Sequence, residues 1–176
     1  LLQFTGHDTH VDYRRELDLD GAVATVTYRA GGARFERTAF SSHPDQVIVE
    51  RVTSDRPGGL SFSATLTTPH ADARTDAFDP RTLRLAGRVG TDGTRFAILL
   101  RVISGSGTIT TAGGRVSVAG ADSASILVTA ATSFRNFRDV GGDPEAAAAS
   151  AMEAASRLGY DGLLARHQAD HRPLGD

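Results

Sequence analysis

Apolar and polar residues alternate along most of the first 140 positions of the chain. The clearest example is the segment 60–67, in which Leu60, Phe62, Ala64 and Leu66 are separated by serine or threonine residues. Successive side chains of a β-strand point to opposite faces, so this alternation predicts a strand with one buried and one solvated face.

About ten such segments follow one another, with turn-forming residues between them. Gly31-Gly32 and Gly113-Gly114 are typical of two-residue hairpin turns. The predicted strands cover 13–20, 23–30, 33–40, 47–52, 60–67, 83–89, 96–103, 109–112, 115–118 and 124–132. The segment 68–82 is polar and is predicted to be a loop. This pattern favours a mainly β fold, an antiparallel β-sandwich.

The first predicted strand carries apolar and acidic residues in alternation. Leu17 and Leu19 are expected on one face of the strand, and Asp18 and Asp20 on the other, where both carboxylates would be solvated.

The pattern changes to a helical one at residue 141. Asp143 is a suitable N-cap, Pro144 suits the first helical position, and an apolar stripe that includes Met152 and Leu158 follows. Gly159 is expected to end this helix, and a second helix is predicted from 161 to about 172. The chain therefore divides into a β-sandwich domain, 1–140, and a helical linker segment, 141–176.

Composition narrows the function classes. The net charge is −2, from 19 basic and 21 acidic residues without charged blocks, which argues against a nucleic-acid or membrane-docking surface. There is no cysteine, so disulfides and thiolate metal sites are excluded. All 19 basic residues are arginine, which indicates a GC-rich genome, and we expect a bacterial source.

Two histidine clusters could ligate a metal ion. His7, Asp8 and His10 lie within four positions, and His167 and His171 are one helical turn apart, the spacing of zinc-binding helices. The alternative interpretations are an exposed loop for the first cluster and a solvated or interfacial helix end for the second. We expect no metal and no cofactor, because neither spacing supplies a further ligand.

Another pair of residues could carry chemistry. His43 and Asp45 flank Pro44 and would form a catalytic His–Asp pair if a nucleophile lay nearby. The alternative is a turn in which Asp45 accepts hydrogen bonds from backbone amides.

Several motifs resemble the N-terminal β-sandwich domain of glycoside hydrolase family 95, the α-L-fucosidases. They are Tyr13–Leu19 (YRRELDL), Phe40–Val49 (FSSHPDQVIV), Asp55–Phe62 (DRPGGLSF) and Gly120–Asp122 with Ala131–Phe134. The resemblance covers nearly the whole chain in order and implies a supersandwich-type fold. It also implies that the catalytic residues lie in a helical barrel that follows this domain. We therefore expect no catalytic residue in this chain.

The predicted function is that of a non-catalytic N-terminal domain of a secreted glycoside hydrolase resembling α-L-fucosidases. Its expected partner is the catalytic (α/α) barrel of the parent protein, and its extracellular location is implied by the resemblance. The alternative is an independent carbohydrate-binding module for fucosylated glycans. Such modules stack sugars on exposed aromatic rings, and a chain with no tryptophan and three tyrosines offers few of them.

The candidate carbohydrate contacts are Phe134, Arg135, Asn136 and Phe137, directly after the last predicted strand. The alternative is that both phenylalanines anchor the linker onto the sandwich. At the other end of the linker, Leu174-Gly175-Asp176 resembles a segment that precedes the position of Leu1 in relatives, so whether it is a contiguous native segment is open.

Overall fold

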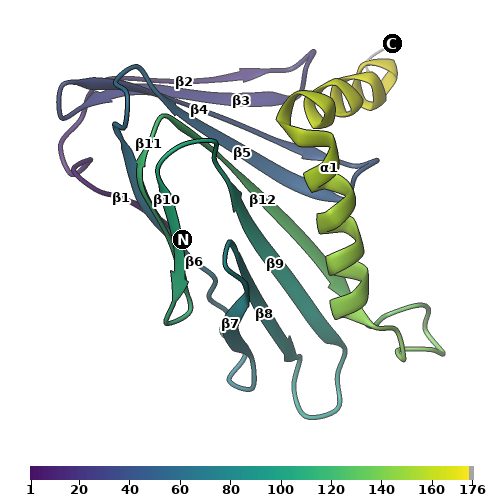
Figure 1. Ribbon diagram of the computed structural model, residues 1–176. Coiled ribbons are helices and arrows are strands. Elements are labelled where there is room, and N and C mark those ends of the chain that lie inside the picture. Colours follow the sequence, from purple (N-terminus) through teal and green to yellow (C-terminus); the bar gives the residue numbers. More distant parts are fainter. Residues whose placement is uncertain (175–176) are drawn as a thin grey trace.

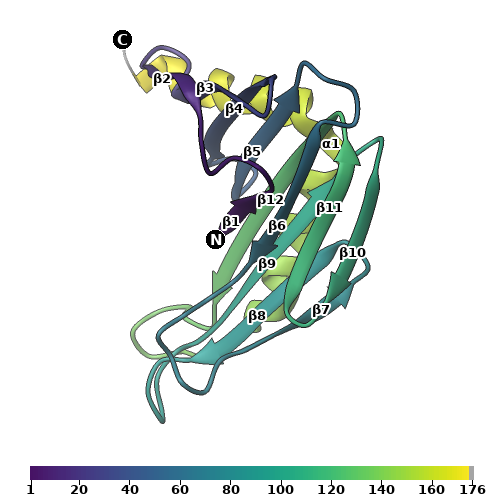
Figure 2. The ribbon, with the colours of Figure 1, turned by 90° about the vertical axis from the view of Figure 1, so that its left-hand side faces the viewer.

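Two antiparallel sheets and one long helix form three layers in the computed structural model, which describes residues 1–174 (Figure 1). The helix α1 covers one face of the larger sheet, and the smaller sheet covers the other (Figure 2). The strands are β1 (Leu2–Phe4), β2 (Val11–Asp18), β3 (Val23–Ala30), β4 (Ala33–Ser42), β5 (Val47–Ser54), β6 (Leu60–Thr65), β7 (Arg74–Asp79), β8 (Thr82–Arg88), β9 (Arg95–Ile103), β10 (Thr108–Ala112), β11 (Arg115–Ala121) and β12 (Ser123–Thr132). The predicted mainly β fold with antiparallel sheets is confirmed.

The two sheets differ in width. The larger sheet has eight strands in the order β2-β3-β4-β5-β12-β9-β8-β7, and the smaller has four in the order β1-β6-β11-β10. The inner face of the larger sheet packs on the smaller sheet through a core that includes Phe35, Val52, Phe62 and Val116. Four strands cannot cover eight, so part of the inner face lies beyond the edge of the smaller sheet.

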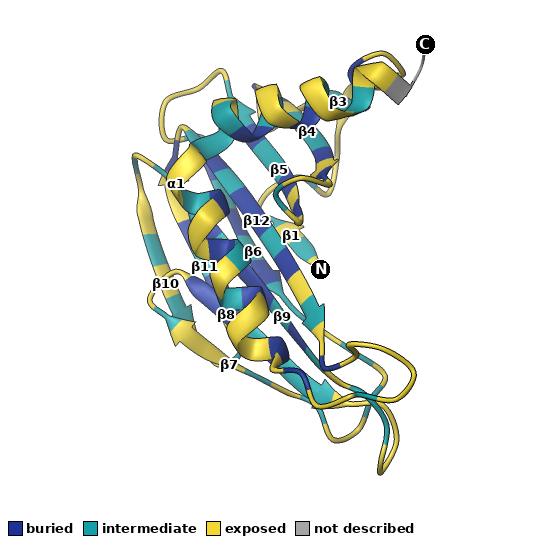
Figure 3. Ribbon diagram, turned by 90° about the vertical axis from the view of Figure 1, so that its right-hand side faces the viewer, coloured by how far each residue is buried: buried dark blue, intermediate teal, exposed yellow. Residues whose placement is uncertain are grey.

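The outer face of the larger sheet is covered by α1 (Pro144–His171). Phe40, Leu99 and Leu127 of the sheet form one buried cluster with Met152 and Leu163 of the helix. The helix presents its buried residues to the sheet and its exposed residues to solvent (Figure 3). No helix of the described residues is long and apolar enough to cross a membrane.

The predicted boundary between two helices becomes a kink within α1. Asp143 caps the helix, since its Oδ1 accepts a hydrogen bond from the Ala146 amide at 3.1 Å. Gly159 has φ 67° and ψ 177°, outside helical geometry, and splits α1 into two arms. The expected burial of Met152 is confirmed, but Leu158 is 42% exposed, because it lies beside the kink on the outer side. A short 3₁₀ turn, η1 (Arg172–Leu174), follows; Gly175 and Asp176, and with them the predicted Leu174-Gly175-Asp176 segment, lie outside the described residues.

The prediction of a loop over 68–82 is wrong in its second half. Residues Arg74–Asp79 form β7, which pairs with β8 at the edge of the larger sheet. Arg84 of β8 holds Asp76 of β7 through two hydrogen bonds of 3.0 and 2.6 Å. The pairing of polar side chains across strands stabilises a strand that has no apolar alternation.

The first predicted strand ends earlier than expected, and its leucine and aspartate pairs do not both lie on it. The strand β2 ends at Asp18, so Leu19 and Asp20 belong to the turn before β3. All eight residues of β2 are exposed, because β2 is an edge strand beyond the reach of the smaller sheet. Leu17 is therefore 63% exposed although it alternates as a core residue would.

Candidate functional site

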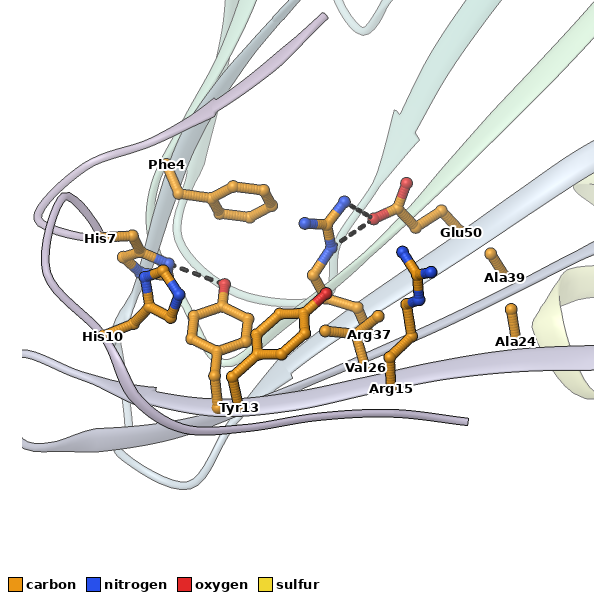
Figure 4. A pocket seen from close by; sticks show the side chains of 11 residues that line it. Phe4, His7, His10, Tyr13, Arg15, Ala24, Val26, Arg37, Ala39 and Glu50 are labelled. Carbon is orange, nitrogen blue, oxygen red and sulfur yellow. Dashed lines mark hydrogen bonds and ion pairs between the residues drawn. The ribbon is translucent and has the colours of Figure 1, made fainter. Parts of the chain in front are cut away.

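A pocket of about 360 Å³ lies where the larger sheet extends beyond the smaller one. The side chains that line it come from β1, the loop after β1, and strands β2–β5 (Figure 4). They are Phe4, His7, His10, Tyr13, Arg15, Ala24, Val26, Tyr28, Arg37, Ala39 and Glu50. Its volume is at the lower end of the range for small-molecule sites, about 300–1,000 Å³.

An ion pair forms the polar wall of this inner-face pocket. Arg37 donates from Nε to Glu50 Oε1 at 2.7 Å, and Arg37 Nη2 lies 2.5 Å from the same oxygen. The Arg37 and Glu50 side chains are 32% and 22% exposed. Two partly desolvated charges of opposite sign hold each other in a defined orientation, so the pair is a preorganised donor–acceptor unit.

Strand register explains why this pair sits on the inner face. Arg37 of β4 is opposite Val26 of β3, and Glu50 of β5 is opposite Ala39 of β4. Val26 and Ala39 also line the pocket, so the four residues share one face of the sheet. Elsewhere on this face of the sheet, the alternating positions carry apolar core residues. At these two positions they carry Arg37 and Glu50.

Aromatic rings form the opposite wall. His7 lies 5.2 Å from Phe4 and 4.2 Å from Phe35, measured between ring centroids. Its Nδ1 is 2.8 Å from the Tyr28 hydroxyl. The guanidinium of Arg37 lies over the Phe4 ring at 4.9 Å, so the aromatic and polar walls contact each other.

Burial sets the protonation states in this wall. It lowers the pKa of His7, and the Arg37 charge lowers that pKa further, while Asp8 acts in the opposite direction. The His7 imidazole is therefore neutral at pH 7. Burial also raises the pKa of Tyr28, so its hydroxyl stays protonated.

A β-bulge places Tyr13 at the mouth of the pocket. The register between β2 and β3 shifts between Val11 and Arg14, and Asp12 has φ 54°. A bulge inserts an extra residue and turns the neighbouring side chains. Tyr13 is 55% exposed and its ring lies 5.7 Å from that of His10.

Sequence reasoning did not find this pocket. It counted the tyrosines only as scarce aromatic residues, and it gave no role to Arg37 or Glu50. The available signal was Glu50, a charged residue inserted in the mostly apolar run 47–52.

His7, His167 and His171 of the two histidine clusters make structural contacts. His7 is held by Tyr28 and two phenylalanine rings, as described above. His167 is buried, stacks on Phe40 at 5.0 Å, and its Nε2 is 3.1 Å from the Ala22 carbonyl. His171 Nε2 is 3.1 Å from the Leu19 carbonyl, so the second arm of α1 holds the β2–β3 turn. Among residues 1–174, no group of three or more His, Asp or Glu is placed to hold a metal ion.

His43 and Asp45 form no catalytic pair. Asp45 accepts hydrogen bonds from Ser42 Oγ at 2.6 Å and Arg166 Nε at 2.8 Å, and its side chain is 6% exposed. His43 Nδ1 instead lies 3.8 Å from Asp170. Asp45 thus connects the β4–β5 turn to α1.

The four predicted carbohydrate contacts lie on a loop between β12 and α1, far along the chain from the pocket residues (Figure 1). Phe134 and Phe137 are 56% and 81% exposed, so the alternative of two phenylalanines anchoring the linker is wrong. Arg135 and Asn136 both donate their backbone amides to the Asp139 carbonyl, at 2.9 and 3.1 Å, which closes the loop into a tight turn. The turn displays both rings to solvent.

Comparison with known proteins identifies the domain. Residues 1–137 match the family described as "Glycosyl hydrolase family 65, N-terminal domain". The chain belongs to this family. The family assignment confirms the resemblance to the N-terminal domain of a glycoside hydrolase that the motifs indicated.

Two relatives of this glycosyl hydrolase N-terminal domain carry fucosidase names. "Alpha-L-fucosidase 2" of Arabidopsis thaliana is 33% identical over 94% of this chain, which spans 23% of that protein. "Probable alpha-fucosidase A" of Aspergillus niger is 49% identical over 43 residues, 24% of this chain and 5% of that protein. The chain thus spans less than a quarter of the length of these relatives.

A solved structure shares the fold. The structure titled "Putative kojibiose phosphorylase from human microbiome" superposes with a TM-score of 0.66 over 97% of this chain and 27% of that chain. The sequence identity is 13%, so the likeness concerns the fold alone. The comparisons therefore show an N-terminal domain of a glycosyl hydrolase family whose sequence is similar to proteins with fucosidase names.

Proposed function

We propose that this domain is the non-catalytic accessory part of a secreted α-L-fucosidase-like enzyme and that it packs against a catalytic (α/α) barrel. In this role the sandwich supports the barrel, and cleavage of fucosylated glycans takes place in the barrel.

One observation carries the non-catalytic part of this proposal. Among the described residues, Glu50 is the only carboxylate that lines the inner-face pocket, and it is paired with Arg37. Hydrolysis of a glycosidic bond with inversion needs two carboxyl groups, about 6.5–9.5 Å apart, one of them free to act as a base. The described lining of the pocket has one carboxyl group, and Arg37 already binds it through Oε1.

The exposed side of α1 supports packing against a barrel. A groove of about 660 Å³ runs between the β4–β5 turn and the helix. Small helical residues, including Ala147, Ala151 and Ala154, line it together with Leu158. Small side chains let a second helix approach closely, and a helical barrel presents helices. The match to less than a quarter of a fucosidase supports a larger parent protein.

Fucose release tests the proposal. The 176-residue chain and the native gene product are incubated with a fucosylated oligosaccharide, and free fucose is measured. We expect release by the native product alone. Release by the 176-residue chain would show that it contains a catalytic site, and release by neither would refute the fucosidase assignment.

Packing against the barrel has its own test. Ala154→Arg would fill the groove on α1 with a long charged side chain, and the isolated domain should keep its stability because Ala154 is exposed. In the native gene product we expect a lower thermal midpoint. An unchanged midpoint in the native product would show that the groove does not face the barrel.

Two finer parts of the proposal concern the glycan and the location. The exposed ring of Phe137 at a loop tip favours a glycan contact by the Phe134, Arg135, Asn136 and Phe137 loop at the rim of the barrel. Phe137→Ala in the native product should raise KM for the oligosaccharide, and an unchanged KM would contradict the contact.

Secretion is checked by finding the native product in culture medium rather than in washed cells.

A further inference from the structure

The inner-face pocket combines an aromatic wall with a preorganised ion pair, and no family assignment gives it a role. We infer that it binds the terminal pyranose ring of a neutral glycan. The inference goes beyond the accessory role, because it concerns a ligand of this domain itself.

The aromatic wall suits one face of a pyranose. A sugar ring has a face of C–H groups and a rim of hydroxyls, and the negative face of an aromatic ring attracts C–H groups. Tyr13 is 55% exposed at the mouth, and Phe4 lies across the pocket from it (Figure 4). A sugar ring that enters between Tyr13 and Phe4 stacks its C–H face on Tyr13. Its hydroxyl rim then faces Arg37.

The ion pair suits the hydroxyl rim. Arg37 binds Glu50 through Oε1, whereas Glu50 Oε2 takes no hydrogen bond from the described residues. No buried side-chain oxygen or nitrogen of residues 1–174 lacks a partner, so Oε2 is accessible to solvent. Two neighbouring sugar hydroxyls can therefore donate to Glu50 and accept from the Arg37 guanidinium. Hydrogen bonds to charged groups are about twice as strong as neutral ones.

The charge of the pocket favours an uncharged ring. Glu50 compensates the charge of Arg37, and the ring of His7 is neutral at pH 7 as shown above. Arg15 is the remaining permanent charge in the lining, and it is exposed on the edge strand β2, where water screens it. The volume of about 360 Å³ holds one sugar ring rather than an extended chain.

The test is an NMR titration of the 176-residue chain with methyl α-L-fucoside, methyl β-D-galactoside and methyl β-D-glucuronide. We expect saturable shifts of pocket residues with at least one neutral glycoside, with a dissociation constant of about 1–10 mM, as one stacked ring with few hydrogen bonds gives. The absence of saturable shifts with both neutral glycosides overturns the proposal. Tighter binding of the glucuronide overturns its neutral specificity.

Variants locate the site. Tyr13→Ala should weaken binding about tenfold or more, which is the loss of ~1.4 kcal/mol. The matched control is Phe78→Ala, which removes another exposed ring, 43% exposed, outside the pocket and should leave binding unchanged. Loss of binding in Phe137→Ala but not in Tyr13→Ala places the sugar on the loop and overturns the pocket assignment.

A second variant distinguishes a loss of binding from a loss of stability. The choice of protein distinguishes a failure of this inference from a failure of the proposed function. His10 is exposed, and His10→Ala should also weaken binding while the thermal midpoint stays the same. If Tyr13→Ala lowers the midpoint, His10→Ala decides the outcome alone. The titration uses this chain without a barrel, so a negative result leaves the fucose-release test of the proposed function in place.

Discussion

The docking of α1 on the larger sheet can be tested at Met152. This side chain is fully buried, at 0% exposure, among Phe40, Leu99 and Leu127 of the outer face. Met152→Ala removes its apolar contacts and leaves a cavity between helix and sheet.

The magnitude follows from burial. Burying a methionine side chain contributes about 1.5–3 kcal/mol, and the unfilled cavity raises the cost of truncation to about 2–5 kcal/mol. Alanine is the better helix former by a few tenths of a kcal/mol, which offsets a small part of this loss. We expect the free energy of unfolding to fall by about 3 kcal/mol. In a chain of this length that lowers the thermal midpoint by about 6–12 °C.

The assay is guanidinium and thermal unfolding, followed by far-UV circular dichroism. Leu158→Ala is the matched control, because Leu158 lies on the same helix at 42% exposure. We expect this control to lose less than about 1 kcal/mol. Equal losses in the two variants would refute the reasoning, since the helix would then not be anchored through Met152.

Three further predictions follow from single residues. Gly159→Ala should cost about 1–3 kcal/mol by thermal unfolding, because φ 67° with ψ 177° suits glycine, whereas Gly162→Ala in the regular helix should cost nothing or stabilise. Arg101→Leu should cost about 1–3 kcal/mol in guanidinium unfolding, because it leaves Asp79 and Glu153 without their shared partner; a loss within error would contradict this. Burial raises the pKa of Asp79, but hydrogen bonds from Arg81 and Thr82 and the Arg101 charge outweigh it and lower that pKa. Stability from Asp79 is thus present above its ordinary pKa of 3.8 and lost as pH falls through the lower folded value, so the acid loss should be shallower in Asp79→Asn.

Local sequence patterns predicted most of the elements correctly. The alternation around Leu60 and Phe62 predicts a half-buried strand, and both side chains are core residues of β6. Asp143 marks the start of α1 through a side-chain hydrogen bond to a nearby backbone amide, and Gly159 marks its kink through backbone geometry. Such features depend on contacts between residues close in the chain, so the sequence carries them directly.

Local patterns do not predict burial or strand pairing at the edges of the larger sheet. Leu17 alternates like a core residue yet is exposed, and polar Arg74–Asp79 forms a strand, because both belong to edge strands of the larger sheet. A period of two shows which residues share a face, but not which strand has a neighbour or what covers that face.

The pocket depends most on tertiary structure. Arg37 and Glu50 are 13 positions apart, and the register of β4 with β5 brings them together. Phe4 and Tyr13 join them only because the smaller sheet ends at β1 and leaves this part of the inner face open. Local patterns along the chain specify most of the strands, the helix cap and the motifs of the family. Long-range strand pairing and the unequal width of the two sheets place the pocket, because neither property is contained in any local stretch of chain.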